Sequence, residues 1–308
     1  MTTIARRRPG GQIGLAVVGV VVGALLLAGC SSARQLGPLP PPPHDSSTLF
    51  GSTVQVHPGE SFAVARVRLN GTFGRLPIIR YYDSGPPDPW HTIRHNVGHS
   101  PVVISFKLPP TALISGSYDH QMRSWFAAAP TGVPTYWSYQ PEPEDEIAAG
   151  DFTAAEFRAA WRHLDDLATS VHNPALKSTL VLMCYTLSPT SGRSWQHYYP
   201  GARYVDVAGW DCYNRLAIQG KYGSPSSIFS PAIDVSRQLH KPFAIAETGS
   251  LLVADDSGSG RARWLLEMAD FLSSQGAVFV TYFNSDVGGD YRLLDAASQH
   301  AWRQVVSG

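Results

Sequence analysis

The sequence predicts an α/β fold, a closed (β/α)8 barrel, over residues 46–308. Short apolar and aromatic runs recur along this part of the chain, and most are separated by amphipathic stretches and turn residues, which is typical of a parallel sheet built from βα units. Its length is usual for one such barrel and large for a single domain of most other classes. Eight runs can be counted, which is the number of strands that closes this barrel.

The expected strands coincide with these eight apolar and aromatic runs. In chain order they are Leu49 to Val54, Leu76 to Tyr82, Pro101 to Phe106, Pro134 to Tyr139, Ser178 to Tyr185, Tyr204 to Trp210, Pro242 to Ala246 and Ala277 to Phe283.

Two helices have the clearest signals. The first opens with a capping-type start at residues 151–156 and then carries Phe157, Trp161, Leu164 and Leu167 at helical spacing. The second spans roughly Arg261 to Ser274, with Trp264, Leu265, Met268 and Leu272 on one face. We expect both apolar faces to pack on the barrel. The run Asp255-Asp256-Ser257-Gly258 has too few correctly spaced oxygen ligands for calcium, so we interpret it as a helix cap.

Residues 1–30 are predicted to be a lipoprotein signal peptide, because three arginines precede an apolar run that ends at a small-residue site before Cys30. Cys30 is the expected lipidation site; the alternative is a plain transmembrane anchor, because the run nears the length that spans a bilayer. Residues 31–45 are rich in Ser and Pro and predict an extended tether. The barrel would then work on the extracytoplasmic face of the cell membrane.

The composition limits the classes of partner that can be expected for this protein. The 24 basic and 24 acidic residues balance, and there is no basic stripe with interleaved aromatics, so nothing indicates nucleic acid. His and Cys residues have no metal-ligand spacing, and no glycine motif is placed to hold a phosphate; we expect no metal and no cofactor. Cys184 and Cys212 lie near the ends of adjacent expected strands, and the sequence leaves a disulfide and two buried thiols equally open. We expect a monomer.

Two glutamates point to chemistry, because each ends an expected strand. Glu142 follows the fourth and Glu247 follows the seventh. The carboxyl ends of barrel strands line one mouth, so the two side chains are expected to converge. A retaining glycosidase needs a protonated carboxyl and an ionised one about 5 to 5.5 Å apart. The sequence therefore predicts glycoside hydrolysis, with Glu142 as the acid and Glu247 as the nucleophile.

The acid role has a competing reading. Glu142 lies among Glu144, Asp145 and Glu146, and neighbouring like charges raise a carboxyl pKa, which favours an acid. The same cluster is also typical of a solvated loop. Glu144 is a rival for the acid/base role, because either glutamate of the run Pro-Glu-Pro-Glu, two residues apart, can be the one that ends the strand.

Three motifs resemble glycoside hydrolase family 26 and its relatives among retaining barrel glycosidases: Pro-Glu-Pro-Glu-Asp after the fourth strand, Val-Ala-Gly-Trp-Asp-Cys-Tyr-Asn after the sixth and Ile-Ala-Glu-Thr-Gly after the seventh. The resemblance runs over nearly the whole domain. It implies Glu142 as acid/base and Glu247 as nucleophile, Tyr213 beside the nucleophile and Asp211 as a brace. It also implies an aromatic floor for the sugar site at Phe283.

Two departures from that family stand out. Pro141 occupies the place where the family usually has His before its acid/base glutamate, and Phe283 stands where many members have Trp. β-Mannan is therefore the leading candidate substrate among β-linked polysaccharides and oligosaccharides rather than the sole one.

Other residues at strand ends are candidates for the substrate site. Arg80 is expected near Glu247, where it would hydrogen-bond a carboxylate and hold its ionised state; the alternative is an ion pair that only braces the barrel mouth. Tyr82, Trp137 and Trp210 could stack on sugar faces, although buried aromatics are more often core.

Two other functions remain open. The first is a carbohydrate-binding lipoprotein that keeps the barrel without efficient catalysis, for which the missing His is the best argument. The second is the solute-binding subunit of a transporter, which predicts two doubly wound lobes rather than eight βα units.

Overall fold

The computed structural model describes residues 48–308, and these form a closed, all-parallel barrel in the strand order β1 to β8, with β1 pairing β8. The predicted signal peptide, Cys30 and the tether lie outside the described residues. The strands are β1 Leu49–Thr53, β2 Ile78–Tyr82, β3 Val102–Phe106, β4 Thr135–Tyr139, β5 Leu176–Met183, β6 Val207–Asn214, β7 Phe243–Ser250 and β8 Phe279–Tyr282. The predicted (β/α)8 fold is confirmed.

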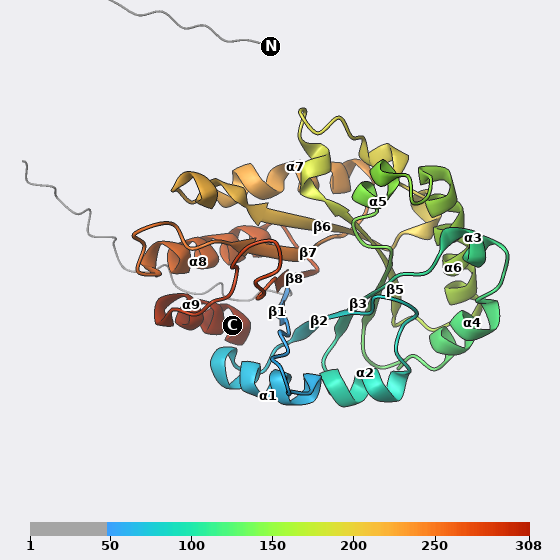
Figure 1. Ribbon diagram of the computed structural model, residues 1–308, viewed down its shortest axis with the longest axis horizontal. Helices are drawn as coiled ribbons and strands as arrows, with labels where there is room; N and C mark the ends of the chain where they lie inside the picture. Colours follow the sequence, from blue (N-terminus) through green and yellow to red (C-terminus); the bar gives the residue numbers. More distant parts are fainter. Residues whose placement is uncertain (1–47) are drawn as a thin grey trace, which may run out of the picture. The chain divides into compact units, whose positions relative to one another are not determined.

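Helices surround the strands on all sides (Figure 1). They are α1 Phe62–Phe73, α2 Trp90–Val97, α3 Pro110–Ile114, α4 Asp119–Ala127, α5 Glu144–Ala149, α6 Ala154–Ser170, α7 Pro225–Gln238, α8 Ser259–Ser274 and α9 Ala296–Ser307. Short 3-10 turns, η1 Cys184–Leu187, η2 Trp195–His197, η3 Ala202–Tyr204 and η4 Arg215–Gln219, follow β5 and β6. Within the described part of the chain, no helix is both long and apolar enough to span a membrane.

The two helix starts follow from local chemistry. Thr153 and Glu156 form a reciprocal capping box at the start of α6, and the predicted apolar stripe of α6 is buried against the barrel. At α8, the Asp256 carboxylate accepts hydrogen bonds from the backbone N–H groups of Gly258, Gly260 and Arg261 at 3.0 Å each. Asp256 thus caps this helix, as predicted, and α8 begins two residues earlier than expected.

The core has two parts. A small cluster fills the inside of the barrel and includes Ile78, Val103, Tyr136 and Phe279. A much larger cluster fills the layer between strands and helices. Both faces of each strand are therefore apolar, which leaves the open mouth at the carboxyl ends as the place where polar side chains collect.

Two strands are longer than the sequence predicted, and this affects the site. β6 continues to Asn214 and β7 to Ser250, so Asp211 and Glu247 lie within strands rather than just after them. The pairing of β6 with β7 shifts register between Trp210 and Asp211, which sets Asp211 opposite Glu247. Such bulges redirect a side chain, and here the shift brings two carboxyl groups to the same mouth.

Candidate active site

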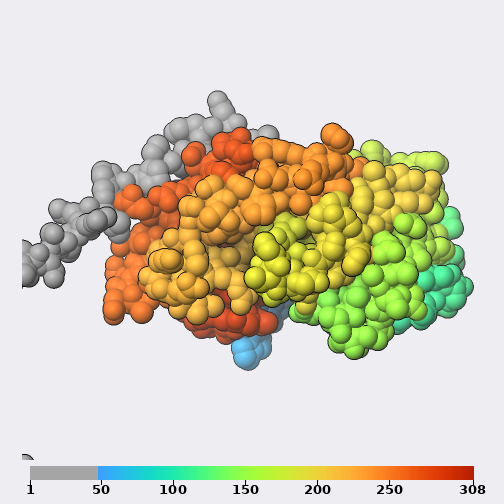
Figure 2. Space-filling view, turned by 90° about the horizontal axis from the view of Figure 1, so that it is seen from above, coloured from blue at the N-terminus to red at the C-terminus, as the bar shows by residue number. Residues whose placement is uncertain are grey.

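A cleft of about 760 Å³ opens at the carboxyl ends of the strands, and both predicted catalytic glutamates line it. Its other lining residues come mostly from the segments after β5, β6 and β8. Figure 2 shows this face hollowed between the yellow segment after β5 and the golden segment after β6. The lining residues are Glu142, Asp145, Met183, Cys184, Tyr185, Asp211, Tyr213, Arg215, Leu216, Ser227, Ile228, Glu247, Phe283, Val287, Gly288 and Tyr291.

Glu247 is held by three donors. The Tyr213 hydroxyl donates to Oε2 at 2.7 Å, and the Tyr82 hydroxyl donates to Oε1 at 2.7 Å. The Arg80 guanidinium also donates to Oε1 at 3.4 Å. Bonds of this kind fix the direction in which the Glu247 carboxyl group points, which suits a nucleophile. The predicted position of Arg80 near Glu247 is confirmed.

Arg80 is itself fully buried beneath the site. Its guanidinium donates to Ser105 Oγ at 2.6 Å and lies 4.3 Å from the centre of the Tyr82 ring. Opposing the effect of burial, the negative charge of nearby acidic groups raises the pKa of Arg80. A permanently charged guanidinium under three carboxyl groups offsets part of their mutual repulsion.

Glu142 has a strained backbone that turns it into the cleft. Its φ is 52° and that of Gln140 is 45°, both in the left-handed region that non-glycine residues rarely adopt. The Glu142 N–H donates to the Val181 carbonyl at 3.0 Å, which ties this turn to β5. Burial, followed by repulsion from Glu247 and Glu144, raises the pKa of Glu142 to about 8. The protonated form of Glu142 is therefore favoured at neutral pH.

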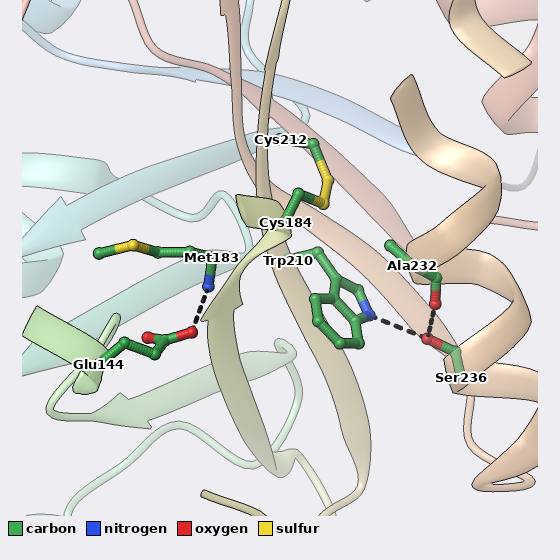
Figure 3. The surroundings of a disulfide bond; sticks show 7 residues. All are labelled: Glu144, Met183, Cys184, Trp210, Cys212, Ala232 and Ser236. Carbon is green, nitrogen blue, oxygen red and sulfur yellow. Dashed lines mark hydrogen bonds between the residues drawn. A yellow bond between two sulfur atoms is a disulfide. The ribbon is translucent and has the colours of Figure 1, made fainter. Parts of the chain in front are cut away.

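Glu144 occupies a different environment. It is fully buried at the start of α5, where one carboxylate oxygen accepts from Thr186 Oγ1 at 2.8 Å and from Met183 N at 2.9 Å. Figure 3 shows the bond from Met183. Burial raises the pKa of Glu144 to about 7. It is not among the cleft-lining residues, so its contacts fit a link between α5 and the end of β5. The geometry favours Glu142 over Glu144 as the acid.

Asp211 is a third carboxyl group at the cleft, and it is 4% exposed. Burial and the neighbouring Glu247 and Glu142 raise its pKa well above the ordinary value. Neither carboxyl oxygen has a hydrogen-bond partner among the described residues. The role of Asp211 as a brace, which the resemblance implies, therefore stays a prediction; the raised pKa favours its protonated form, which can donate to a bound hydroxyl.

Aromatic rings form one floor of the cleft. Phe283 contacts Tyr213 edge-on with ring centres 5.9 Å apart, and Tyr291 lies 5.0 Å from Tyr213 and 6.0 Å from Phe283. Phe283 was predicted here, whereas Tyr291 was missed because it follows β8 in an irregular loop with no strand-end signal. Tyr82 is 43% exposed as a residue, and its hydroxyl donates to Glu247.

Trp137 and Trp210 are not sugar platforms, which corrects that part of the sequence prediction. Trp137 is 1% exposed and stacks on Trp161 of α6, with ring centres 5.4 Å apart. The indole N–H of Trp210 donates to Ser236 Oγ of α7 at 2.9 Å, and Figure 3 shows the ring directed at that helix. Both side chains point out of the barrel into the helix-facing core.

Cys184 and Cys212 form a disulfide that joins the end of β5 to β6, with Cα atoms 5.0 Å apart. Cys184 lines the cleft, and Cys212 stands between Asp211 and Tyr213 in β6. The bond therefore ties the strand that carries two site residues to its neighbour. Among residues 48–308, no group of three His, Cys, Asp or Glu side chains is placed to hold a metal ion.

No known protein-family model and no curated protein matches the chain. Solved structures do match. A family 26 β-mannanase from Bacteroides ovatus aligns over 85% of this chain and 88% of its own, with 13% identity and a TM-score of 0.54. A glucosidase from Croceicoccus marinus aligns over 86% and 68%, with 13% identity and a TM-score of 0.60.

A third match is a 4-O-α-L-rhamnosyl-β-D-glucuronidase from Fusarium oxysporum, with 16% identity, coverage of 87% and 72% and a TM-score of 0.54. The shared feature is the barrel. At these identities the likeness shows the fold, a TIM barrel similar to those of family 26 mannanases and other glycoside hydrolases.

Proposed function

We propose that the protein is a retaining glycoside hydrolase that cleaves β-linked polysaccharide or oligosaccharide, with β-mannan as the leading candidate. One observation carries the proposal: a single cleft contains a carboxylate held by three donors, Glu247, and a second carboxyl, Glu142, whose pKa is about 8. An acid that is favoured in its protonated form near neutral pH and a second carboxyl group oriented by three donors are the two groups that acid-and-nucleophile catalysis requires.

In the first step, a Glu247 oxygen attacks the anomeric carbon while the Glu142 carboxyl gives its proton to the leaving glycosidic oxygen. The product is a glycosyl ester of Glu247 and a free sugar alcohol. In the second step, the Glu142 carboxylate takes a proton from water, the water oxygen attacks the anomeric carbon, and Glu247 is released as a carboxylate. Tyr213, Tyr82 and Arg80 stabilise the carboxylate that forms in this release.

The shape of the mouth supports a chain substrate. A second hollow of about 320 Å³ shares Glu142, Asp145 and Met183 with the main cleft. A third, of about 400 Å³, shares Lys107, Glu146 and Asp151 with the second. Shared lining residues place the three hollows side by side, with Glu142 between the main cleft and the second hollow, an arrangement that suits a substrate longer than one sugar.

The test is hydrolysis of β-mannan, β-glucan, xylan and arabinogalactan by the full chain, with Glu142→Gln and Glu247→Gln variants alongside. Glu267→Gln is the matched control, since Glu267 is an exposed carboxylate on α8 outside the cleft. We expect sugar release that both cleft variants abolish and the control keeps, with retained anomeric configuration in the initial product by NMR. Binding without cleavage, equal in all four proteins, would instead support a carbohydrate-binding protein.

We also propose, from the sequence, that a lipid on Cys30 anchors the protein at the extracytoplasmic face of the membrane. Mass spectrometry of the mature N-terminus would detect a diacylglyceryl cysteine. An unprocessed N-terminus would leave the plain transmembrane anchor.

A further inference from the structure

We propose that the cleft accommodates a hydrocarbon chain carried by the sugar substrate, so that the substrate is a lipid-bearing or acylated glycoside. The inference deepens the proposed function and rests on the same cleft. Its basis is an aliphatic wall, which we define as Leu216, Ile228 and Val287.

The three residues of the wall come from three separate elements. Leu216 belongs to η4 after β6, Ile228 to the first turns of α7, and Val287 to the loop after β8. A methyl group at Gly223 would come within 3.0 Å of Leu216 Cδ1 and 3.4 Å of Ile228 Cδ1, so these two side chains converge on the same point. Leu216 and Ile228 are half-buried, and Val287 is 69% exposed.

Sugar faces do not account for this wall. Carbohydrate C–H patches suit flat aromatic rings, and the cleft supplies these separately as Tyr213, Phe283 and Tyr291 beside Glu247. Branched aliphatic side chains offer no flat face, and their exposure to water is unfavourable in proportion to area. A flexible hydrocarbon is the ligand chemistry that they match.

The position of the wall fixes what can reach it. Leu216, Ile228 and Val287 line the same cavity as Glu142 and Glu247, so a molecule that fills this cavity contacts both the wall and the proposed reaction centre. The neighbouring hollow beyond Glu142 has a different character, because its lining includes Lys107, Glu146 and Asp151. A sugar bearing one apolar substituent can therefore place its polar part by the carboxyls and its hydrocarbon on the wall.

A hydrocarbon can be attached in two ways, as an alkyl aglycone or as an acyl ester on a sugar hydroxyl. Both sources present the same chain, and the probes separate them. The first pair is octyl and methyl β-D-mannopyranoside; the second is methyl 6-O-octanoyl-β-D-mannopyranoside and its non-acylated parent. Binding to the full chain is measured by calorimetry below the micelle concentration, which does not depend on turnover.

Each buried CH₂ strengthens binding about fourfold, so burial of three of them predicts roughly 60-fold tighter binding of the octyl or octanoyl compound. Leu216→Asn and Ile228→Thr are expected to reduce that ratio at least fivefold. Val287→Ser provides a variant at an exposed position that keeps the fold. Val67→Ser is the matched control, because Val67 is 64% exposed on α1, outside the cleft.

A preference confined to one pair identifies how the chain is attached, and either pair supports the inference. The inference is overturned if chain-bearing and chain-free compounds bind equally, or if the preference is the same in the wall variants as in Val67→Ser. Tight, wall-dependent binding without cleavage of any glycoside would refute the hydrolase proposal while leaving the hydrocarbon site standing. Cleavage of polysaccharide without a preference for hydrocarbon-bearing compounds would support the hydrolase proposal and refute the hydrocarbon site.

Discussion

Replacing Tyr213 by Phe removes one hydroxyl and tests how Glu247 is controlled. That hydroxyl donates to Oε2 at 2.7 Å, and among the described residues Oε2 has no other hydrogen-bond donor, whereas Oε1 has Tyr82 and Arg80. A hydrogen bond to a charged group contributes about 1.5 to 3 kcal/mol. If the bond stabilises the transition state for release of the Glu247 carboxylate by this amount, its loss lowers kcat about 10- to 150-fold.

The effect should fall mainly on the second step, because the carboxylate forms as the glycosyl ester breaks. Tyr213→Phe should therefore accumulate the glycosyl-enzyme. The assay is 4-nitrophenyl β-mannoside hydrolysis, with stopped-flow detection of a nitrophenol burst and mass spectrometry of the intact protein. The phenyl ring keeps its contacts with Phe283 and Tyr291, so the melting temperature should change little.

Tyr81→Phe is the matched control. Tyr81 donates to the Asp88 carboxylate at 2.6 Å, a similar bond formed away from the cleft. This control should lower stability modestly and leave kcat and KM unchanged. The reasoning is refuted if folded Tyr213→Phe retains wild-type kcat with no burst, or if Tyr81→Phe loses as much activity.

Three further predictions concern pH and packing. Because the pKa of Glu142 is raised to about 8, the acid form persists at neutral pH, and kcat/KM should fall tenfold per pH unit above about 8; activity that already falls as the pH rises above about 5 would contradict this. The pKa of Glu144 is raised from 4.5 to about 7, so the folded state disfavours its ionisation, and stability should decline by up to about 3 kcal/mol as pH rises through that window. Urea unfolding at pH 4.5 and 8 should show this decline, and a Glu144→Gln variant that keeps the full wild-type decline would contradict it. Trp137→Phe should lower the free energy of unfolding by roughly 1 to 3 kcal/mol without raising KM. Phe283→Ala, at a residue that lines the cleft, should raise KM. A higher KM for Trp137→Phe would indicate that Trp137 contacts the substrate after all.

The order of strands and helices was predictable from sequence because a parallel barrel alternates them regularly. Each strand is an apolar run bounded by turn residues, and the capping box at Thr153 and Glu156 is a purely local signal. The pair Glu142 and Glu247 was also predictable, since the ends of parallel strands share one mouth whatever the loops do.

The sequence did not determine in which direction the strand side chains point. Both faces of a barrel strand are buried, so apolar character cannot tell which face points inward, and Trp137 and Trp210 were assigned to the wrong side. Glu142 and Glu144 have nearly the same sequence context. Only the left-handed turn at Glu142 and the buried contacts of Glu144 with Met183 and Thr186 separate their environments.

The tertiary structure alone decided the details on which the chemistry depends. The register shift opposite Glu247, the disulfide between Cys184 and Cys212 and the approach of Tyr291 to the site all join segments distant in sequence. The protonation of the site also depends on the tertiary structure. The raised pKa of Glu142 results from burial and from a carboxyl group more than a hundred positions away in the sequence. A local pattern can predict which elements form, but distances between elements arise only when the barrel closes.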